Sequence, residues 1–255
     1  MDLGLADRVY VVTGGSKGLG FATARALVDD GARVVLVSRS ADSLTAAAEQ
    51  LGERARVLAA DMADPTLPSR AVDEAVRAYG RIDGGLISVG GPPPGTVLTT
   101  SDEQWRQAFE SVFLGGIRMA RTLCERMIEG GAPQGGAIAW VLSTSAEQVI
   151  TGLTTSNGLR PGLAMVIKDL ADEVGSFGIR VNGVLPNNIA TDRLASLAGW
   201  DSSAGARERG AAGIPLRRYG EPAEFGRVAA FVLSPAASYV TGSLVRVDGG
   251  VTRLP

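Results

Sequence analysis

The sequence contains no histidine among its 255 residues. Histidine is the commonest general base near neutral pH and a frequent metal ligand, so serine–histidine catalysis and histidine-based zinc sites are excluded. Cys124 is the single cysteine, which rules out an internal disulfide and a cysteine-rich metal cluster. We therefore predict no metal site and expect any chemistry to use serine, tyrosine, lysine, arginine or carboxylate side chains.

The sequence also has no excess of positive charge and no long apolar run. The formal net charge is −2 and no block of lysine and arginine is present, which argues against nucleic-acid binding. No stretch is long and apolar enough to span a bilayer, and residues 1–8 lack the apolar core of a signal peptide. We expect a cytoplasmic protein without membrane contact, whose partner is a small-molecule substrate.

Short β-branched runs alternate with longer helical patterns along the chain. Strands are expected at residues 9–12, 33–37, 56–58, 85–89, 137–142, 180–185 and 244–247, and helices at 19–30, 40–50, 68–79, 102–129, 158–175 and 223–233. Nearly continuous apolar strands are typical of a parallel sheet that is covered on both faces. The sequence predicts the α/β class, with a doubly wound, Rossmann-type parallel sheet flanked by helices and residues 1–255 forming a single dinucleotide-binding domain.

A glycine-rich stretch, Thr13-Gly14-Gly15-Ser16-Lys17-Gly18-Leu19-Gly20, lies between the first strand and the first helix. Glycines at such a turn let backbone N–H groups approach a pyrophosphate, and the helix dipole adds to the attraction. A tight turn without a ligand could also contain these glycines. The flanking strand and helix favour nucleotide binding.

Further motifs follow along nearly the whole chain. They are Asp61, Tyr79-Gly80-Arg81-Ile82-Asp83, Val181-Asn182-x-Val184-x-Pro186, Ile189-Ala190-Thr191 and Tyr239-Val240-Thr241-Gly242. Together with the glycine-rich stretch they resemble the short-chain dehydrogenase/reductases, in the branch that includes the 3-oxoacyl-acyl-carrier-protein reductases.

The resemblance implies a set of cofactor-binding residues. Asp61 would hold the adenine amino group, Thr13 would brace the turn against the fourth strand, and Thr191 would reach the pyrophosphate or carboxamide. The full set is Thr13, Gly14, Ser16, Lys17, Gly18, Leu19, Gly20, Ser38, Arg39, Asp61, Met62, Gly90, Arg160, Pro186, Ile189 and Thr191.

The choice of cofactor follows from the end of the second strand. An NAD site has a carboxylate there, whereas this chain has Ser38-Arg39, together with Lys17 in the glycine-rich stretch. Two cations suit the 2′-phosphate of NADP(H), which we expect in preference to NAD(H). The alternative is that Lys17 and Arg39 are only solvated.

The catalytic positions depart from the family pattern. In the family a tyrosine supplies the proton, a lysine four residues later lowers its pKa, a serine holds the substrate oxygen and an asparagine supports a water chain. Here Ser143 matches the serine, but Ser156 replaces the tyrosine, Arg160 the lysine and Val112 the asparagine. A serine hydroxyl is a far poorer acid than a phenol, and arginine cannot pass a proton, although Arg160 could stabilise negative charge on oxygen.

Two functions remain open at this point. The first is an NADP(H)-binding oxidoreductase of carbonyl or alcohol substrates that lacks the usual tyrosine/lysine relay and uses Ser143, Ser156 and Arg160 as its catalytic residues. Its proton would come from water, from the substrate or from another group, such as Glu147 if that carboxyl were buried. The second is a catalytically silent NADP(H)-binding protein, acting as a redox sensor or as a partner subunit.

Assembly and substrate access are further expectations. In the family the helices that correspond to 102–129 and 158–175 pack across a two-fold axis, which implies a homotetramer. Residues 190–213 follow the carboxyl end of a strand and contain Trp200, so they are expected to form a substrate lid. The alternative for this segment is a solvent-exposed excursion.

Overall fold

The apolar runs form parallel strands in a computed structural model that describes residues 2–130, 135–197 and 210–254. Within these residues one seven-stranded sheet has the order β3-β2-β1-β4-β5-β6-β7. The strands are β1 (Val9–Thr13), β2 (Arg33–Ser38), β3 (Ala55–Ala59), β4 (Gly84–Ile87), β5 (Gly136–Val141), β6 (Ile179–Pro186) and β7 (Leu244–Val247). The predicted doubly wound α/β class is confirmed.

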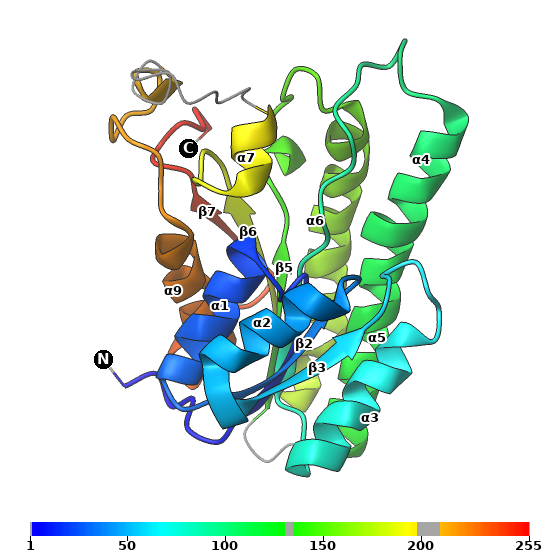
Figure 1. The fold of residues 1–255 in the computed structure, drawn as a ribbon, viewed down its shortest axis with the longest axis vertical. Coiled ribbons are helices and arrows are strands. Elements are labelled where there is room, and N and C mark those ends of the chain that lie inside the picture. Colours follow the sequence, from blue (N-terminus) through cyan, green and yellow to red (C-terminus); the bar gives the residue numbers. More distant parts are fainter. Residues whose placement is uncertain (1, 131–134, 198–209, 255) are drawn as a thin grey trace.

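Helices cover both faces of the sheet (Figure 1). One face carries α1 (Gly18–Asp29), α2 (Ala41–Leu51) and α9 (Pro222–Leu233), and the other carries α3 (Leu67–Tyr79), α5 (Gly115–Glu129) and α6 (Thr154–Val174). Along β1, Val9 and Val11 enter the core under α3, α5 and α6, while Tyr10 and Val12 enter the core under α1 and α9. Because both faces are buried, the central strands β1, β4 and β5 are almost entirely apolar.

Strand order reverses between β1 and β4, which are direct neighbours. In open parallel sheets, ligands bind at such a switch point, beyond the carboxyl ends of the strands. Thr13, Ser38 and Pro186 end their strands at this edge. The edge is where the predicted site residues gather.

The long helix expected at residues 102–129 is interrupted. It consists of α4 (Asp102–Ala108), a π-helical turn, η2 (Phe109–Leu114), and α5. Gly115 directly follows the π turn, and a Cβ atom there would overlap the carbonyl oxygen of Met62. The π turn thus coincides with a close tertiary approach to the chain after β3, which helical periodicity does not report.

Helix α6 begins at Thr154, four residues before its predicted start. The residues before it pair with the proline-rich loop at residues 90–95. Gly95 N–H donates to the Gly152 carbonyl, and Thr154 N–H donates to the Gly95 carbonyl. This pairing fixes the backbone directly before the helix. Other elements begin and end within two residues of their predicted bounds.

The segment expected to be a lid contains a short helix, α7 (Asp192–Leu197). The chain directly before α7 is held by a parallel β-bridge between Ile189 and Gly220. Residues 198–209, including Trp200, lie outside the described residues, so the lid stays a prediction. None of the helices in the described parts of the chain has the length and apolar character needed to cross a membrane.

Candidate active site

The glycine-rich stretch forms a tight loop between β1 and α1. Gly14 and Gly18 have φ angles of 61° and 58°, in the left-handed region that favours glycine. A Cβ atom on Gly20 would overlap the carbonyl oxygen of Gly14. Glycine at position 20 therefore lets the first turn of α1 pack directly on the loop.

The amino end of α1 is free to bind an anion. Lys17 occupies the N-cap position but makes no side-chain capping bond, and the first turn contains no acidic residue. A Cβ atom on Gly18 would meet only the methyl group of Thr191, at 3.9 Å. The loop therefore faces Thr191 across open space, and its N–H groups could hold a pyrophosphate.

Thr13 joins the glycine-rich loop to the residue that directly follows β4. Its hydroxyl donates to the Ser88 carbonyl at 2.8 Å and accepts from the Ser88 N–H at 2.8 Å. The remaining predicted cofactor residues lie at the same edge of the sheet: Ser16 and Leu19 around the start of α1, Met62 after β3, Gly90 after β4, Pro186 at the end of β6 and Ile189 before α7.

The neighbouring strand ends could hold the adenosine part of a dinucleotide. Ser38 has a buried hydroxyl without a hydrogen-bond partner in the described residues, so a polar group is needed beside it. Arg39 directly follows and is largely exposed, with its guanidinium 4.0 Å from the Asp61 carboxylate. Lys17 is also exposed. These residues fit NADP(H), with two cations available for a 2′-phosphate.

Ser143 follows β5 and is only partly buried. Its hydroxyl oxygen accepts a hydrogen bond from Ser145 N–H at 3.1 Å, and its hydroxyl proton has no acceptor among the described residues. The Ser145 side chain turns inward, where its oxygen lies 2.8 Å from the hydroxyl oxygen of Ser156. Ser143, Ser145 and Ser156 thus form a serine cluster. Ser143 is the member whose hydroxyl can donate a hydrogen bond outward.

Arg160 lies directly beside Ser156 on α6. Its Nε donates to the Ser156 hydroxyl at 3.0 Å, and its Nη1 donates to the Val141 carbonyl at 2.9 Å. The residue is only 6% exposed. Burial lowers the pKa of the guanidinium to about 10, and the positive charge of Arg193 adds to this effect. Arg160 therefore remains charged at neutral pH, and its Nη2 has no hydrogen-bond partner in the described residues.

No phenol lies in the serine cluster. Tyr10 donates to the Leu233 carbonyl from inside the core, and burial raises its pKa. Tyr79 ends α3, Tyr219 packs with Ala211 and Ile214, and Tyr239 is fully exposed before β7. Val112, at the expected asparagine position, is buried in the π turn.

Glu147 is held in an ion pair. Its two carboxylate oxygens accept from Nε and Nη2 of Arg246, at 2.6 and 3.0 Å. A carboxylate in a bidentate pair with a guanidinium serves as a hydrogen-bond acceptor. This arrangement argues against Glu147 as the replacement acid.

Two further residues at this edge of the sheet were not predicted from the sequence. Arg193 on α7 donates to the carbonyls of Gly91 and Pro92, at 2.7 and 2.9 Å, and so ties α7 to the proline-rich loop. Asn187 donates from Nδ2 to the Thr144 hydroxyl at 2.7 Å, directly beside Ser143. Both contacts join segments far apart in the sequence, and no local pattern indicates them.

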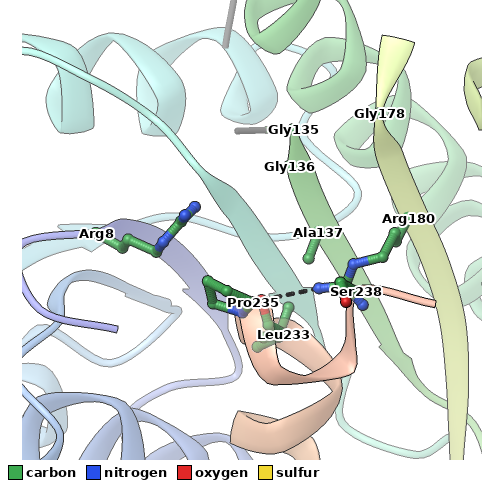
Figure 2. A pocket seen from close by; sticks show the side chains of 9 residues that line it. All are labelled: Arg8, Gly135, Gly136, Ala137, Gly178, Arg180, Leu233, Pro235 and Ser238. Atoms are coloured by element: carbon green, nitrogen blue, oxygen red, sulfur yellow. Dashed lines mark hydrogen bonds between the residues drawn. The ribbon is translucent and has the colours of Figure 1, made fainter. Parts of the chain in front are cut away.

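A separate pocket lies at the opposite end of the sheet (Figure 2). It encloses about 170 Å³ between the starts of β5 and β6 and the turn after α9. Its Arg180 donates to the carbonyls of Val232, Leu233, Ser234 and Val240. Arg180 binds the last carbonyls of α9 and so holds the end of this helix against β6. The pocket therefore has a structural role and lies away from the glycine-rich loop. No cluster of metal-ligating side chains occurs in the described residues.

Comparisons with known proteins agree with this geometry. A family model described as enoyl-(acyl carrier protein) reductase matches residues 14–252. L-rhamnose 1-dehydrogenase (NAD(P)(+)) from Azotobacter vinelandii is 34% identical, over 97% of this chain and 97% of its own. The 3-oxoacyl-[acyl-carrier-protein] reductase of Chlamydia trachomatis is 29% identical, over 97% of this chain and 98% of its own.

A solved structure extends the likeness to three dimensions. L-sorbose reductase from Gluconobacter frateurii, complexed with NADPH and L-sorbose, superposes with a TM-score of 0.91 and 31% identity, and the match covers 100% of both chains. Fold, glycine-rich loop and sequence similarity lead to the same assignment. The chain belongs to the short-chain dehydrogenase/reductase family of oxidoreductases.

Proposed function

We propose that this protein is an NADP(H)-dependent oxidoreductase that reduces a carbonyl group without a tyrosine proton donor. The cofactor would be held by the loop from Thr13 to Gly20, by Ser38 and Arg39 at its ribose, and by Asp61 at its adenine. When bound, the dihydronicotinamide supplies a hydride. The family contains enzymes of this chemistry, among them the NADPH-bound L-sorbose reductase.

The carbonyl oxygen would be held by this chain's own donors. The outward-facing hydroxyl of Ser143 can donate to that oxygen, and the buried charge of Arg160 can stabilise the negative charge that develops there. As the carbonyl carbon gains a hydride, the π electron pair moves to oxygen. Water then supplies the proton, which leaves an alcohol and hydroxide.

The central observation is the buried hydrogen-bonded chain from Ser145 through Ser156 to Arg160. Ser156 accepts from Arg160 and also binds Ser145, so its hydroxyl is fully engaged inside the protein. We therefore assign Ser156 as a positioning residue that orients the guanidinium. Arg160 and Ser143 are left as the groups that contact the substrate oxygen.

Absorbance of NADPH gives the test. Purified protein is mixed with NADPH and a panel of ketones, quinones and oxoacyl thioesters, and loss of absorbance is followed for the wild type and for Ser143→Ala. Turnover that falls at least about 100-fold in the variant supports the proposal. Turnover that Ser143→Ala leaves unchanged contradicts the role of this hydroxyl.

A silent NADP(H)-binding protein is the second candidate. The hydrogen bonds of Ser156 favour this candidate. A buried hydroxyl that is bonded on two sides can stabilise the fold without taking part in a reaction. Tight NADPH binding without turnover of any compound in the panel would support this candidate.

We also propose a homotetramer. An apolar strip on the outer helices supports it: Phe109 and Phe113 stack with their ring centroids 5.2 Å apart, and Met165 on α6 is 71% exposed. Exposed apolar side chains on adjacent helices are typical of subunit contacts.

A further inference from the structure

Arg160 carries a buried positive charge that has no negative partner among the described residues. Arg8, the other deeply buried arginine of the described residues, is paired with the carboxylate of Asp83 at 3.3 Å. Within the part of the chain that the structure describes, the partners of Arg160 are neutral: the Ser156 hydroxyl and the Val141 carbonyl. Burying an unpaired charge is costly unless a counter-ion reaches it. Arg160 therefore needs an anion that the described part of the chain does not supply.

A second guanidinium, that of Arg193 on α7, lies at the same edge of the sheet. Arg193 reaches from α7 to the Gly91 and Pro92 carbonyls and likewise has no carboxylate partner in the described residues. Its charge contributes to the lowered pKa of Arg160. The nearby Glu147 is committed to Arg246, so it does not neutralise this pair.

Both arginines adjoin the expected substrate position. Arg160 lies beside the serine cluster that contains Ser143, and Arg193 holds the loop that continues to Gly95. Gly95 in turn pairs with Gly152 and Thr154 at the start of α6, the helix that carries Arg160. The two cations thus belong to a connected set of segments around the Ser143 hydroxyl.

We infer that the substrate carries a carboxylate, bound between Arg160 and Arg193, so that the carbonyl compound is an oxo acid and its reduced form a hydroxy acid. The inference rests on the proposed reductase function. The Nη2 of Arg160 has no hydrogen-bond partner in the described residues, so it can donate a charge-assisted hydrogen bond to a carboxylate. The pyrophosphate of the cofactor would lie at the glycine-rich loop and would leave this pair without a counter-ion.

Matched pairs of compounds separate acid from neutral substrates. Oxo acids with the ketone one, two or three carbons from the carboxylate are compared with their methyl esters. NADPH oxidation is measured alongside direct binding of the same compounds to the NADP⁺-loaded protein by calorimetry. We expect the acids to bind at least about 10-fold more tightly than their esters, as befits a charge-assisted hydrogen bond.

Two variants identify the residues. Arg193→Gln should weaken acid binding by about 10- to 100-fold and leave ester binding unchanged. Arg160→Gln should weaken acid binding by at least as much and ester binding to a smaller extent, because Arg160 also contacts the carbonyl oxygen in the proposed mechanism. Arg160→Lys keeps the charge and should recover part of the affinity. Arg77→Gln removes an exposed arginine on α3 and serves as the charge control. Far-UV circular dichroism and thermal midpoints verify that each variant is folded.

The outcomes separate this inference from the proposed function. Acids that bind through both arginines but are never reduced would support the anion site and overturn the reductase. Esters or neutral ketones that are reduced as well as the acids would support the reductase and overturn the anion site. The anion site would also be overturned if no acid binds, or if the acids bind both glutamine variants as tightly as the wild type.

Discussion

The Nε of Arg160 donates a hydrogen bond of 3.0 Å to the hydroxyl oxygen of Ser156, four residues earlier on α6. By the resemblance to the family, these two side chains are predicted to stand at the positions of its lysine and tyrosine. Here their bond joins a fixed cation to a neutral acceptor, and it provides no proton relay. In the proposed mechanism, the pair therefore places a charge beside the serine cluster and the proton comes from water.

Removing this acceptor should weaken the fold. Ser156→Ala leaves Nε of Arg160 buried without a partner, so we expect the free energy of unfolding to fall by about 1–3 kcal/mol. Urea denaturation measures the change, with Ser69→Ala on the exposed surface of α3 as the control. Equal stability of Ser156→Ala and the wild type would mean that the bond does not hold Arg160.

Cofactor affinity should depend on the close contact at Gly20. In Gly20→Ala the added methyl group overlaps the Gly14 carbonyl, so the loop must shift and NADPH affinity should fall at least about 10-fold. Fluorescence titration with NADPH measures it. Gly175→Ala is the matched control, because a Cβ there meets nothing within 4 Å. Unchanged NADPH affinity in Gly20→Ala would place the cofactor elsewhere.

Much of this site could be predicted from residue patterns because its parts are local. The glycine-rich loop combines a strand, a turn and a helix that adjoin in the sequence, and the apolar runs of β1 and β2 are continuous. The π turn at Phe109–Leu114 escaped prediction because it coincides with the approach of Gly115 to Met62, a contact between distant segments. The bond from Arg193 to Gly91 joins residues about one hundred positions apart, and periodicity carries no information on such pairs.

The cofactor preference should depend on the cation after β2. Arg39→Glu replaces a positive charge with a negative one where the 2′-phosphate is expected, so the preference for NADPH over NADH should fall at least about 10-fold. Binding titrations with both cofactors measure the ratio, and Arg77→Glu on α3 controls for net charge. An unaltered ratio of NADPH to NADH affinity, or a wild type that prefers NADH, would mean that Arg39 does not bind the 2′-phosphate.

Assembly should be sensitive to the apolar strip on the outer helices. Met165→Asp would place a charge in a subunit contact, where it loses water without gaining a partner. We expect light scattering at micromolar concentration to give a tetramer for the wild type and a smaller species for the variant. Val57→Asp alters an exposed side chain on the edge strand β3 and is the control. A monomeric wild type would refute the proposed tetramer.

Hydride transfer is the central claim, and isotope labelling tests it most directly. NADPH carrying deuterium at the transferable C4 position is incubated with the protein and a carbonyl compound, and the products are analysed by mass spectrometry. We expect one deuterium on the new carbinol carbon for each NADPH consumed, and none when Arg160 is replaced by methionine. Bound NADPH that retains all its deuterium beside every carbonyl compound tested would contradict it.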